Sequence, residues 1–191
     1  MSIEQPTYTS LSSSGSREVR RYEARIVAET TVEGTREKAL NEAFSILAGY
    51  IFGGNMPAAR IAMTAPVTQS REAERIAMTA PVFQQKTKEG EATRWVVQFT
   101  MPAQYQIGDL PRPTDERVRI REVPASTMAV TRFSGFARTK ALETKEKELR
   151  AFMAGEKLDA VGEAVYAFYN PPFTLPPLRR NEVLIEVAPR G

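Results

Sequence analysis

The stretch RIAMTAPV at residues 60–67 recurs letter for letter at residues 75–82, beginning 15 residues after the first copy begins. An identity of mixed chemistry over eight residues indicates a local duplication. Apolar side chains occupy every second position of each copy, which is the period of a strand and not of a helix. Seven mostly polar residues at 68–74 separate the copies, and this is short enough for a hairpin loop. The duplication therefore predicts two extended segments, each with an apolar, methionine-bearing face, paired as an antiparallel hairpin.

The composition limits the classes of function. The 191 residues are 42% hydrophobic and 26% charged, which is typical of a soluble chain that can bury a substantial core. A net charge of +3 does not indicate a nucleic-acid-binding surface. The chain contains no cysteine and no histidine, which excludes a thiolate nucleophile, a Ser-His-Asp triad, a Cys- or His-based metal site and an imidazole ligand for haem iron. Any chemistry must therefore use carboxylates, Tyr, Lys, Arg, Ser, Thr or Met.

The N-terminal segment differs in composition from the remainder. Residues 1–17 are rich in Ser and Thr and lack the apolar stretch of a signal peptide, so we expect a disordered leader and a cytoplasmic location. No linker divides residues 18–191, which we expect to form a single domain. No run of about 18 apolar residues is present, so no membrane span is expected.

Two hydrophobic periods follow one another in the same order in each half of the chain. Alternation predicts strands at 18–32, 95–101, 118–120, 128–133, 165–169 and 181–187. Helical spacing predicts helices at 36–50 and 140–154, with the apolar stripes Leu40, Ala43, Phe44, Leu47 and Ile51, and Leu142, Leu149, Phe152 and Met153. The order strand, helix, strands begins near Val19 and again near Val118. It predicts an α+β fold in two pseudo-symmetric halves, with an antiparallel barrel-like sheet and two helices outside it.

The methionine-bearing face of the repeats is the first candidate for function. Ile, Met, Ala and Val are ordinary interior residues, so this face is either core packing or the wall of an apolar ligand pocket. Methionine suits a pocket wall because its side chain adapts to irregular shapes.

A proline-rich segment near the C-terminus is the second candidate. Two Pro-Pro pairs frame Phe173, and Arg179 and Arg180 follow directly. The segment is either a crossing between strands with solvated charges or the rim of a pocket whose guanidinium groups pair with ligand carboxylates.

Two carboxylates on one face of the last predicted strand are the third candidate. Glu182 and Glu186 are either the polar face of that strand or a general acid and base, for which Tyr169 is a further candidate. The polar face is the more common situation for such residues.

Several of these stretches resemble the SOUL haem-binding protein family. In family order they are VRRYE at 19–23, FGGN at 52–55, IAMTAPV in both copies, FTMP at 99–102, FSG at 133–135, YNPP at 169–172 and RRNEV at 179–183. They run from about Glu18 to Val187, and the doubled segment is similar to the bacterial form of the family. One copy of the repeat is then expected to be an insertion.

The resemblance implies a distorted eight-stranded antiparallel β-barrel flanked by two helices, and binding of haem or another tetrapyrrole. In some members haem is thought to lie in an apolar groove beside the Met-Thr-Ala-Pro-Val segment and a basic residue after the Pro-Pro loop. On this basis the expected groove comprises Arg60, Ile61, Met63, Ala65, Met78, Tyr169, Phe173, Arg179 and Arg180. We expect Met63 or Met78 against the ring and Arg179 or Arg180 on the propionates. Because the axial histidine proposed for some members has no counterpart here, only water, Met or Tyr remains for the iron.

The fold also resembles effector-binding domains related to the gyrase-inhibitor proteins, which bind amphipathic small molecules and include a few hydrolases. Two functional hypotheses follow. One is a non-catalytic tetrapyrrole-binding protein without a structural metal. The other is a small-molecule hydrolase or effector-binding module that uses Glu182, Glu186 or Tyr169.

Overall fold

The computed structural model describes residues 3–56, 73–89 and 92–189 of the chain. The polypeptide forms strands, two long helices and one short 3₁₀ helix, in the order β1 (Tyr8–Ser14), β2 (Arg17–Tyr22), β3 (Arg25–Glu33), α1 (Arg36–Ile51), β4 (Asn55–Met56), β5 (Val82–Glu89), β6 (Ala92–Thr100), β7 (Arg112–Pro113), β8 (Arg119–Val123), β9 (Ser126–Phe133), α2 (Thr139–Gly155), β10 (Leu158–Ala160), β11 (Val165–Phe168), η1 (Pro176–Leu178) and β12 (Asn181–Pro189). None of the helices in these described ranges is long and apolar enough to cross a membrane.

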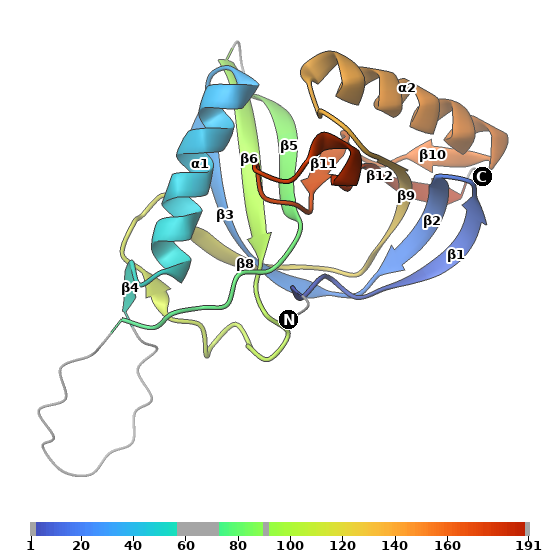
Figure 1. Cartoon of the computed structure of the whole chain (residues 1–191). Helices are drawn as coiled ribbons and strands as arrows, with labels where there is room; N and C mark the ends of the chain where they lie inside the picture. Colours follow the sequence, from blue (N-terminus) through green and yellow to red (C-terminus); the bar gives the residue numbers. More distant parts are fainter. Residues whose placement is uncertain (1–2, 57–72, 90–91, 190–191) are drawn as a thin grey trace, which may run out of the picture.

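One antiparallel sheet of ten strands organises the molecule. Its strands follow the order β1-β2-β9-β12-β11-β5-β6-β3-β8, and β10 pairs with β12 outside this path. The sheet curls into a half-barrel whose path ends at β1 and β8 (Figure 1). The short strands β4 and β7 form a separate pair. The predicted α+β fold, with a curled antiparallel sheet and two helices, is confirmed.

The order of the strands in the sheet explains the two predicted halves. Both halves read strand, strand, helix, strand, strand along the chain: β2-β3-α1-β5-β6 and then β8-β9-α2-β11-β12, with short additional elements between them. In the sheet, β8-β3-β6-β5 mirrors β2-β9-β12-β11 about the pairing of β5 with β11. The first strand of each half is thus exchanged, because β2 pairs with β9 and β8 pairs with β3.

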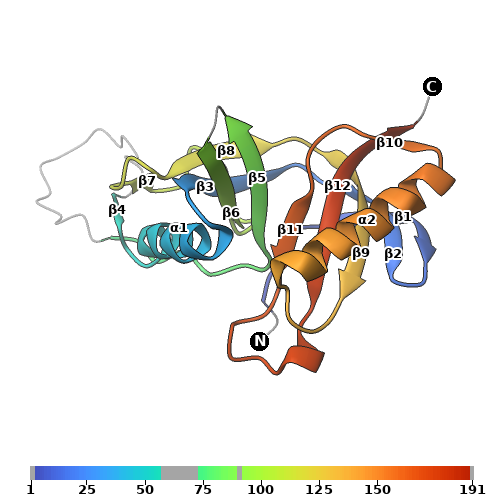
Figure 2. The ribbon, with the colours of Figure 1, turned by 90° about the horizontal axis from the view of Figure 1, so that it is seen from above.

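The two helices pack on the same side of the sheet (Figure 2). Helix α1 covers β3 and β6, and helix α2 covers β9, β10 and β12. Both helix boundaries lie within a residue of the predicted ones because the apolar stripes are local signals. The predicted stripe of α1 needs one correction: Phe44 is exposed, while Ala39, Ile46 and Tyr50 are buried instead. In α2, Leu142, Leu149 and Met153 are buried as predicted.

The strand predicted at 18–32 is in fact two strands. β2 ends at Tyr22 and β3 begins at Arg25, because the chain passes from one half of the sheet to the other at residues 23–24. The segment 1–17, for which disorder was predicted, contains β1. Tyr8 of β1 packs against Tyr22 of β2 at 5.1 Å between ring centroids.

The second copy of the repeat enters the sheet only at its last residue. β5 begins at Val82, so residues 75–81 belong to no strand. Main-chain contacts hold the segment: the amide of Ile76 donates to the carbonyl of Ile51 at 2.9 Å. Ile76 and Ala80 are buried, but Met78, predicted on the same face, is exposed. The first copy and the predicted hairpin between the copies lie outside the described residues.

Candidate functional site

The second copy of the repeat and the proline-rich loop leave the sheet at the same end. In the register of β5 and β11, Val82 lies opposite Phe168. The second copy runs into Val82 and the loop begins directly after Phe168, so antiparallel pairing places both segments beside one sheet end. Met78 and Phe173, one from each segment, are exposed. Two segments that the sequence predicted to share a groove therefore lie in one region.

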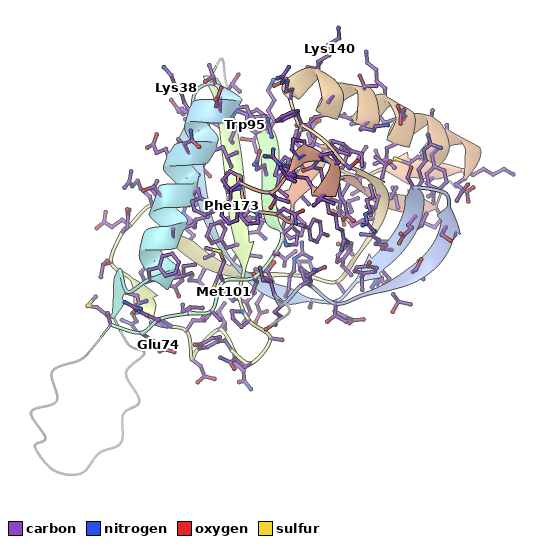
Figure 3. All side chains as sticks on the ribbon, viewed as in Figure 1. Lys38, Glu74, Trp95, Met101, Lys140 and Phe173 are labelled. Carbon is purple, nitrogen blue, oxygen red and sulfur yellow. The ribbon has the colours of Figure 1, made fainter. Side chains whose placement is uncertain are left out.

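Arg179 fixes the shape of the proline-rich loop. Its Nε donates to the carbonyl oxygen of Thr174 at 2.7 Å, and its Nη2 donates to that of Pro172 at 2.6 Å. The loop holds Phe173 on the side facing α1, with 86% of its surface exposed (Figure 3). Three large apolar side chains of this loop are exposed: Phe173, Leu175 and Leu178.

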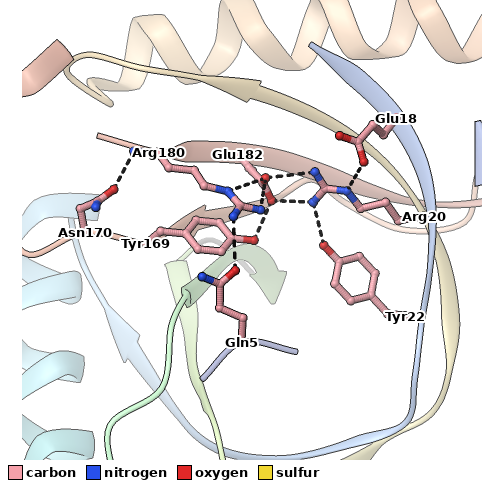
Figure 4. Close-up of polar contacts among 8 residues, drawn as sticks. All are labelled: Gln5, Glu18, Arg20, Tyr22, Tyr169, Asn170, Arg180 and Glu182. Atoms are coloured by element: carbon pink, nitrogen blue, oxygen red, sulfur yellow. Dashed lines mark hydrogen bonds and ion pairs between the residues drawn. The ribbon is translucent and has the colours of Figure 1, made fainter. Parts of the chain in front are cut away.

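Arg180 points to a different place from Arg179. Its Nε and Nη2 both donate to Oε1 of Glu182, at 3.0 and 2.8 Å, and its guanidinium lies 3.9 Å from the ring centroid of Tyr169. Its Nη1 donates to Oε1 of Gln5 at 3.2 Å. Its amide donates to Oδ1 of Asn170 at 2.6 Å (Figure 4). The two neighbouring arginines therefore serve two separate sets of contacts.

Glu182 is the centre of a buried polar network. Its side chain has no exposed surface and accepts hydrogen bonds from two guanidinium groups and one phenol (Figure 4). Arg20 donates from Nη1 to Oε2 at 2.9 Å and from Nη2 to Oε1 at 3.2 Å. The hydroxyl of Tyr169 donates to Oε2 at 2.7 Å. With the two bonds from Arg180, the carboxylate accepts five hydrogen bonds and has no free lone pair.

Arg20 is the second arginine of the network, and it is not among the candidate residues predicted from the sequence. Its Nε donates to Oε2 of Glu18 at 2.8 Å and its Nη1 to the hydroxyl of Tyr22 at 3.1 Å. The ring of Tyr8 covers the guanidinium at 4.4 Å. A signal was present, because strand alternation places Arg20 on the same face as the buried Tyr22.

The network shifts the pKa values of its members in the directions that favour these charges and hydrogen bonds. Burial opposes the charge of Arg20, but its hydrogen bonds to Glu18 and Glu182 raise its pKa above the ordinary value. The hydrogen bond from Arg20 lowers the pKa of Glu18. Burial and the negative charge of Glu182 raise the pKa of Tyr169 far above its ordinary range. The phenol therefore holds its proton and donates a hydrogen bond to Glu182.

The two carboxylates predicted on one face of the last strand share that face but not their surroundings. Glu182 is fully buried, whereas Glu186 is exposed. In the register of β12 and β9, Glu182 lies opposite Arg132 and Glu186 opposite Met128. A general base needs a lone pair for the substrate proton, and Glu182 has all of them occupied.

The other predicted groove residues separate into three sets. Arg60, Ile61, Met63 and Ala65 lie outside the described residues. Met78, Phe173 and Arg179 lie at the exposed end of the sheet, and Tyr169 and Arg180 belong to the buried network. Among the residues that the structure describes, no group of three or more Asp or Glu side chains is placed to hold a metal ion.

Comparison with protein families gives a match over nearly the whole chain. The model described as "SOUL heme-binding protein" matches residues 3–74 and again residues 68–186. The two matches overlap between the copies of the repeat, so each match contains one copy. This agrees with the expectation that one copy is an insertion. Heme-binding protein 1 of Mus musculus is 32% identical over 154 residues, covering 80% of this chain and 73% of the mouse protein.

Solved structures show the same fold at low sequence identity. The C-terminal domain of EcmrR superposes with a TM-score of 0.62 at 9% identity, covering 95% of this chain and 98% of that domain. A hydrolase from Listeria innocua gives a TM-score of 0.58 at 12% identity, covering 90% and 91%. At these identities the likeness concerns the fold alone.

Proposed function

The chain belongs to the SOUL haem-binding protein family, and on that premise we propose that it binds haem or a related tetrapyrrole without catalysing a reaction. The proposed site is the end of the sheet where the second copy of the repeat and the proline-rich loop meet. The observation that carries this proposal is the loop itself, which is fixed by Arg179 and yet presents Phe173, Leu175 and Leu178 to water.

The apolar side chains of the loop suit the face of a porphyrin. A soluble protein gains stability by burying such side chains, and a cluster of them on a rigid loop usually marks a binding surface. Phe173 can stack on a flat ring, and Met78 supplies an adaptable apolar contact from the neighbouring segment. Because Arg179 already orders the loop, little entropy is lost when a ligand binds.

Arg179 is the better candidate for the ligand carboxylates. Among the described residues, no carboxylate is paired with Arg179, whereas Arg180 makes two hydrogen bonds to Glu182. An arginine that already neutralises a buried glutamate has little charge left for a propionate. We therefore assign the propionate contact to Arg179 and a structural role to Arg180.

The residues present fit the organic part of haem better than its iron. The chain has no histidine and no cysteine, so the iron is left to water, Met or Tyr. The hydroxyl of Tyr169 already donates to Glu182. Of the described residues at the proposed site, this leaves Met78 as the candidate axial ligand. We expect modest affinity, a broad Soret band and nearly equal binding of metal-free protoporphyrin.

The hydrolase hypothesis has weaker support. Glu182 has no lone pair free to accept a proton, and burial keeps Tyr169 protonated. Glu186 is solvated and exposed. The likeness to the Listeria innocua hydrolase concerns the fold alone, and a shared fold does not carry a shared activity.

Titration with hemin and with protoporphyrin, followed by absorbance and fluorescence, tests the proposal. Leu175→Ser should weaken binding of both by roughly fivefold or more, from the loss of about 1 kcal/mol of apolar contact. Leu11→Ser in β1 is the matched control, because Leu11 is 58% exposed and Leu175 65%. Absence of saturable binding of either ligand to the wild-type protein would overturn the proposal.

A change of ligand separates the pairing of Arg179 with the ligand carboxylates from its role in ordering the loop. Arg179→Gln should weaken binding of protoporphyrin by roughly 5- to 100-fold, as expected for about 1–3 kcal/mol from a charged hydrogen bond. The dimethyl ester of protoporphyrin has no carboxylate, so the same substitution should leave its affinity nearly unchanged. Equal losses for the acid and the ester would show that Arg179 acts only by ordering the loop.

A further inference from the structure

The inner face of the half-barrel contains a small cleft on the side of the sheet opposite the helices. Along β12, Val183 and Ile185 pack with α2, so Leu184 points to the inner face. The cleft has a volume of about 230 Å³, and its walls include Tyr22, Phe83, Met128, Leu184, Gln98 and Arg25. The proline-rich loop contributes no residue to it. This cleft is therefore separate from the proposed tetrapyrrole site.

Arg25 is a cation that the described part of the fold leaves without a counter-ion. Its guanidinium lies 5.7 Å from the ring centroid of Tyr22 and 5.2 Å from that of Phe83. Its Nε and Nη1 are buried and have no hydrogen-bond partner. Arg121, which lines the same cleft, instead donates from Nε to Oε2 of Glu29 at 2.8 Å.

Arg25 as a whole is only partly buried, but its Nε and Nη1 are shielded from water without a hydrogen-bond partner, which is unfavourable. Contacts with two aromatic rings compensate only a part of this loss of hydration. Burial lowers the pKa of Arg25, and the positive charge of Arg121 acts in the same direction. An anion bound beside Arg25 would remove this penalty.

The surroundings of Arg25 specify what kind of anion fits. Phe83, Met128 and Leu184 are apolar, so the body of the ligand should be apolar. Glu163 and Glu186 also line the cleft, but both are exposed and their charges are screened by water. We propose that this cleft binds a small single-ring aromatic carboxylate, whose carboxylate pairs with Arg25 and whose ring packs against Phe83, Met128 and Leu184.

The size of the cleft separates this ligand from the one in the proposed function. Pockets for drug-sized ligands usually span about 300–1,000 Å³, so about 230 Å³ suits one ring with its substituent and not a tetrapyrrole. Arg25 also lines a second cleft of about 580 Å³ between residues 4–7 and 100–105. Arg25 thus borders both clefts.

A titration of the wild-type protein followed by NMR tests the charge preference directly. Benzoate should bind with a Kd on the order of 1 mM, as expected for a ligand of so few atoms. Benzamide and benzylamine have the same ring without a negative charge, and each should bind at least tenfold more weakly. Equal binding of the three probes would overturn the proposal. So would the absence of benzoate binding at concentrations up to about 20 times the expected Kd.

Variants locate the site and separate it from the tetrapyrrole surface. Arg25→Met keeps the apolar stem between the rings, and it should abolish the preference for benzoate over benzamide. Arg21→Gln is the control, because Arg21 is an exposed arginine that does not line the cleft, and the preference should remain. Met128→Trp fills the cleft without removing the charge, so it should prevent binding of benzoate even if Arg25→Met does not fold.

Hemin distinguishes failure of this inference from failure of the proposed function. Met128→Trp should leave hemin binding unchanged, because no residue of the proposed tetrapyrrole surface lines this cleft. Loss of hemin binding in Met128→Trp together with loss of benzoate binding would place both ligands in one site and overturn the assignment of separate sites. Retention of benzoate binding in Met128→Trp would exclude this cleft as the benzoate site.

Discussion

Two arginine–carboxylate pairs lie on the inner face of the sheet, one on each side of the β5–β11 pairing, and they differ in burial. Arg20 comes from β2 and Arg121 from β8, the two exchanged strands. Arg20 pairs with Glu182 at 2.9 Å, and Arg121 pairs with Glu29 at 2.8 Å. The side chains of the first pair are 2% and 0% exposed, whereas those of the second are 46% and 16% exposed.

The neighbours of the exchanged strands account for this difference. β8 is the last strand of the sheet, so Arg121 lies at an open edge. β2 is followed by β1, whose Tyr8 covers Arg20, and Arg180 reaches Glu182 from the proline-rich loop. The arginines thus come from equivalent strands, but their carboxylates come from the non-equivalent strands β12 and β3, and one pair is buried while the other is solvated. Burial makes the first far more sensitive to the loss of a partner.

The largest effect is expected from removal of the buried carboxylate charge. Glu182→Gln removes the carboxylate that Arg20 and Arg180 share, and leaves the 2% exposed Arg20 with Glu18 alone as its counter-ion, so the free energy of unfolding should fall by about 3–5 kcal/mol. Urea denaturation measures this loss. Glu186→Gln, on the same face of the same strand but exposed, is the control and should change stability by less than about 0.5 kcal/mol. Equal losses in the two variants would contradict a special cost of burial.

Local features of the fold were predictable from the sequence, whereas the buried pair was not, because its two residues lie far apart in the chain. The helical stripes are local, and they located α1 and α2 to within a residue. The break between β2 and β3 was missed because Glu23 and Ala24 carry no turn signal such as Gly or Pro. Arg20 lies on the same face of its strand as Tyr22, but its burial depends on Glu182, which is 162 residues away in the chain. Sequence periodicity cannot supply a partner at that distance.

The next effect concerns the cover that β1 provides. Tyr8→Ala removes the ring over Arg20 and its contact with Tyr22, and it should lower the free energy of unfolding by about 2 kcal/mol. The buried pair should also become sensitive to salt, because water would then reach it. Urea titrations at low and high salt measure both effects. Leu11→Ala, an exposed position of the same strand, should change neither quantity.

Tyr169 gives a test by pH. Its pKa is raised by burial and by Glu182, so the folded state keeps the phenol neutral where the unfolded state ionises near 10. The stabilisation is fully present below pH 10 and is lost as pH rises above it, at about 1.4 kcal/mol per pH unit. Tyr169→Phe should cost about 1–3 kcal/mol at neutral pH and flatten this alkaline decline. An unchanged slope of stability against pH would contradict the assignment.

The smallest effect is expected from the exposed pair. Glu29→Gln removes the carboxylate that accepts from Arg121 and from Nε2 of Gln98 at 2.9 Å, but water can replace it as a partner for the exposed guanidinium. The free energy of unfolding should therefore fall by less than about 1 kcal/mol. At 1 M salt the screening length is about 3 Å, so the difference from wild type should nearly vanish, whereas that of Glu182→Gln should persist. Parallel urea titrations of both variants at 0.05 and 1 M salt measure this. A large, salt-insensitive loss in Glu29→Gln would show that the edge strand shields its ion pair as β1 shields the other.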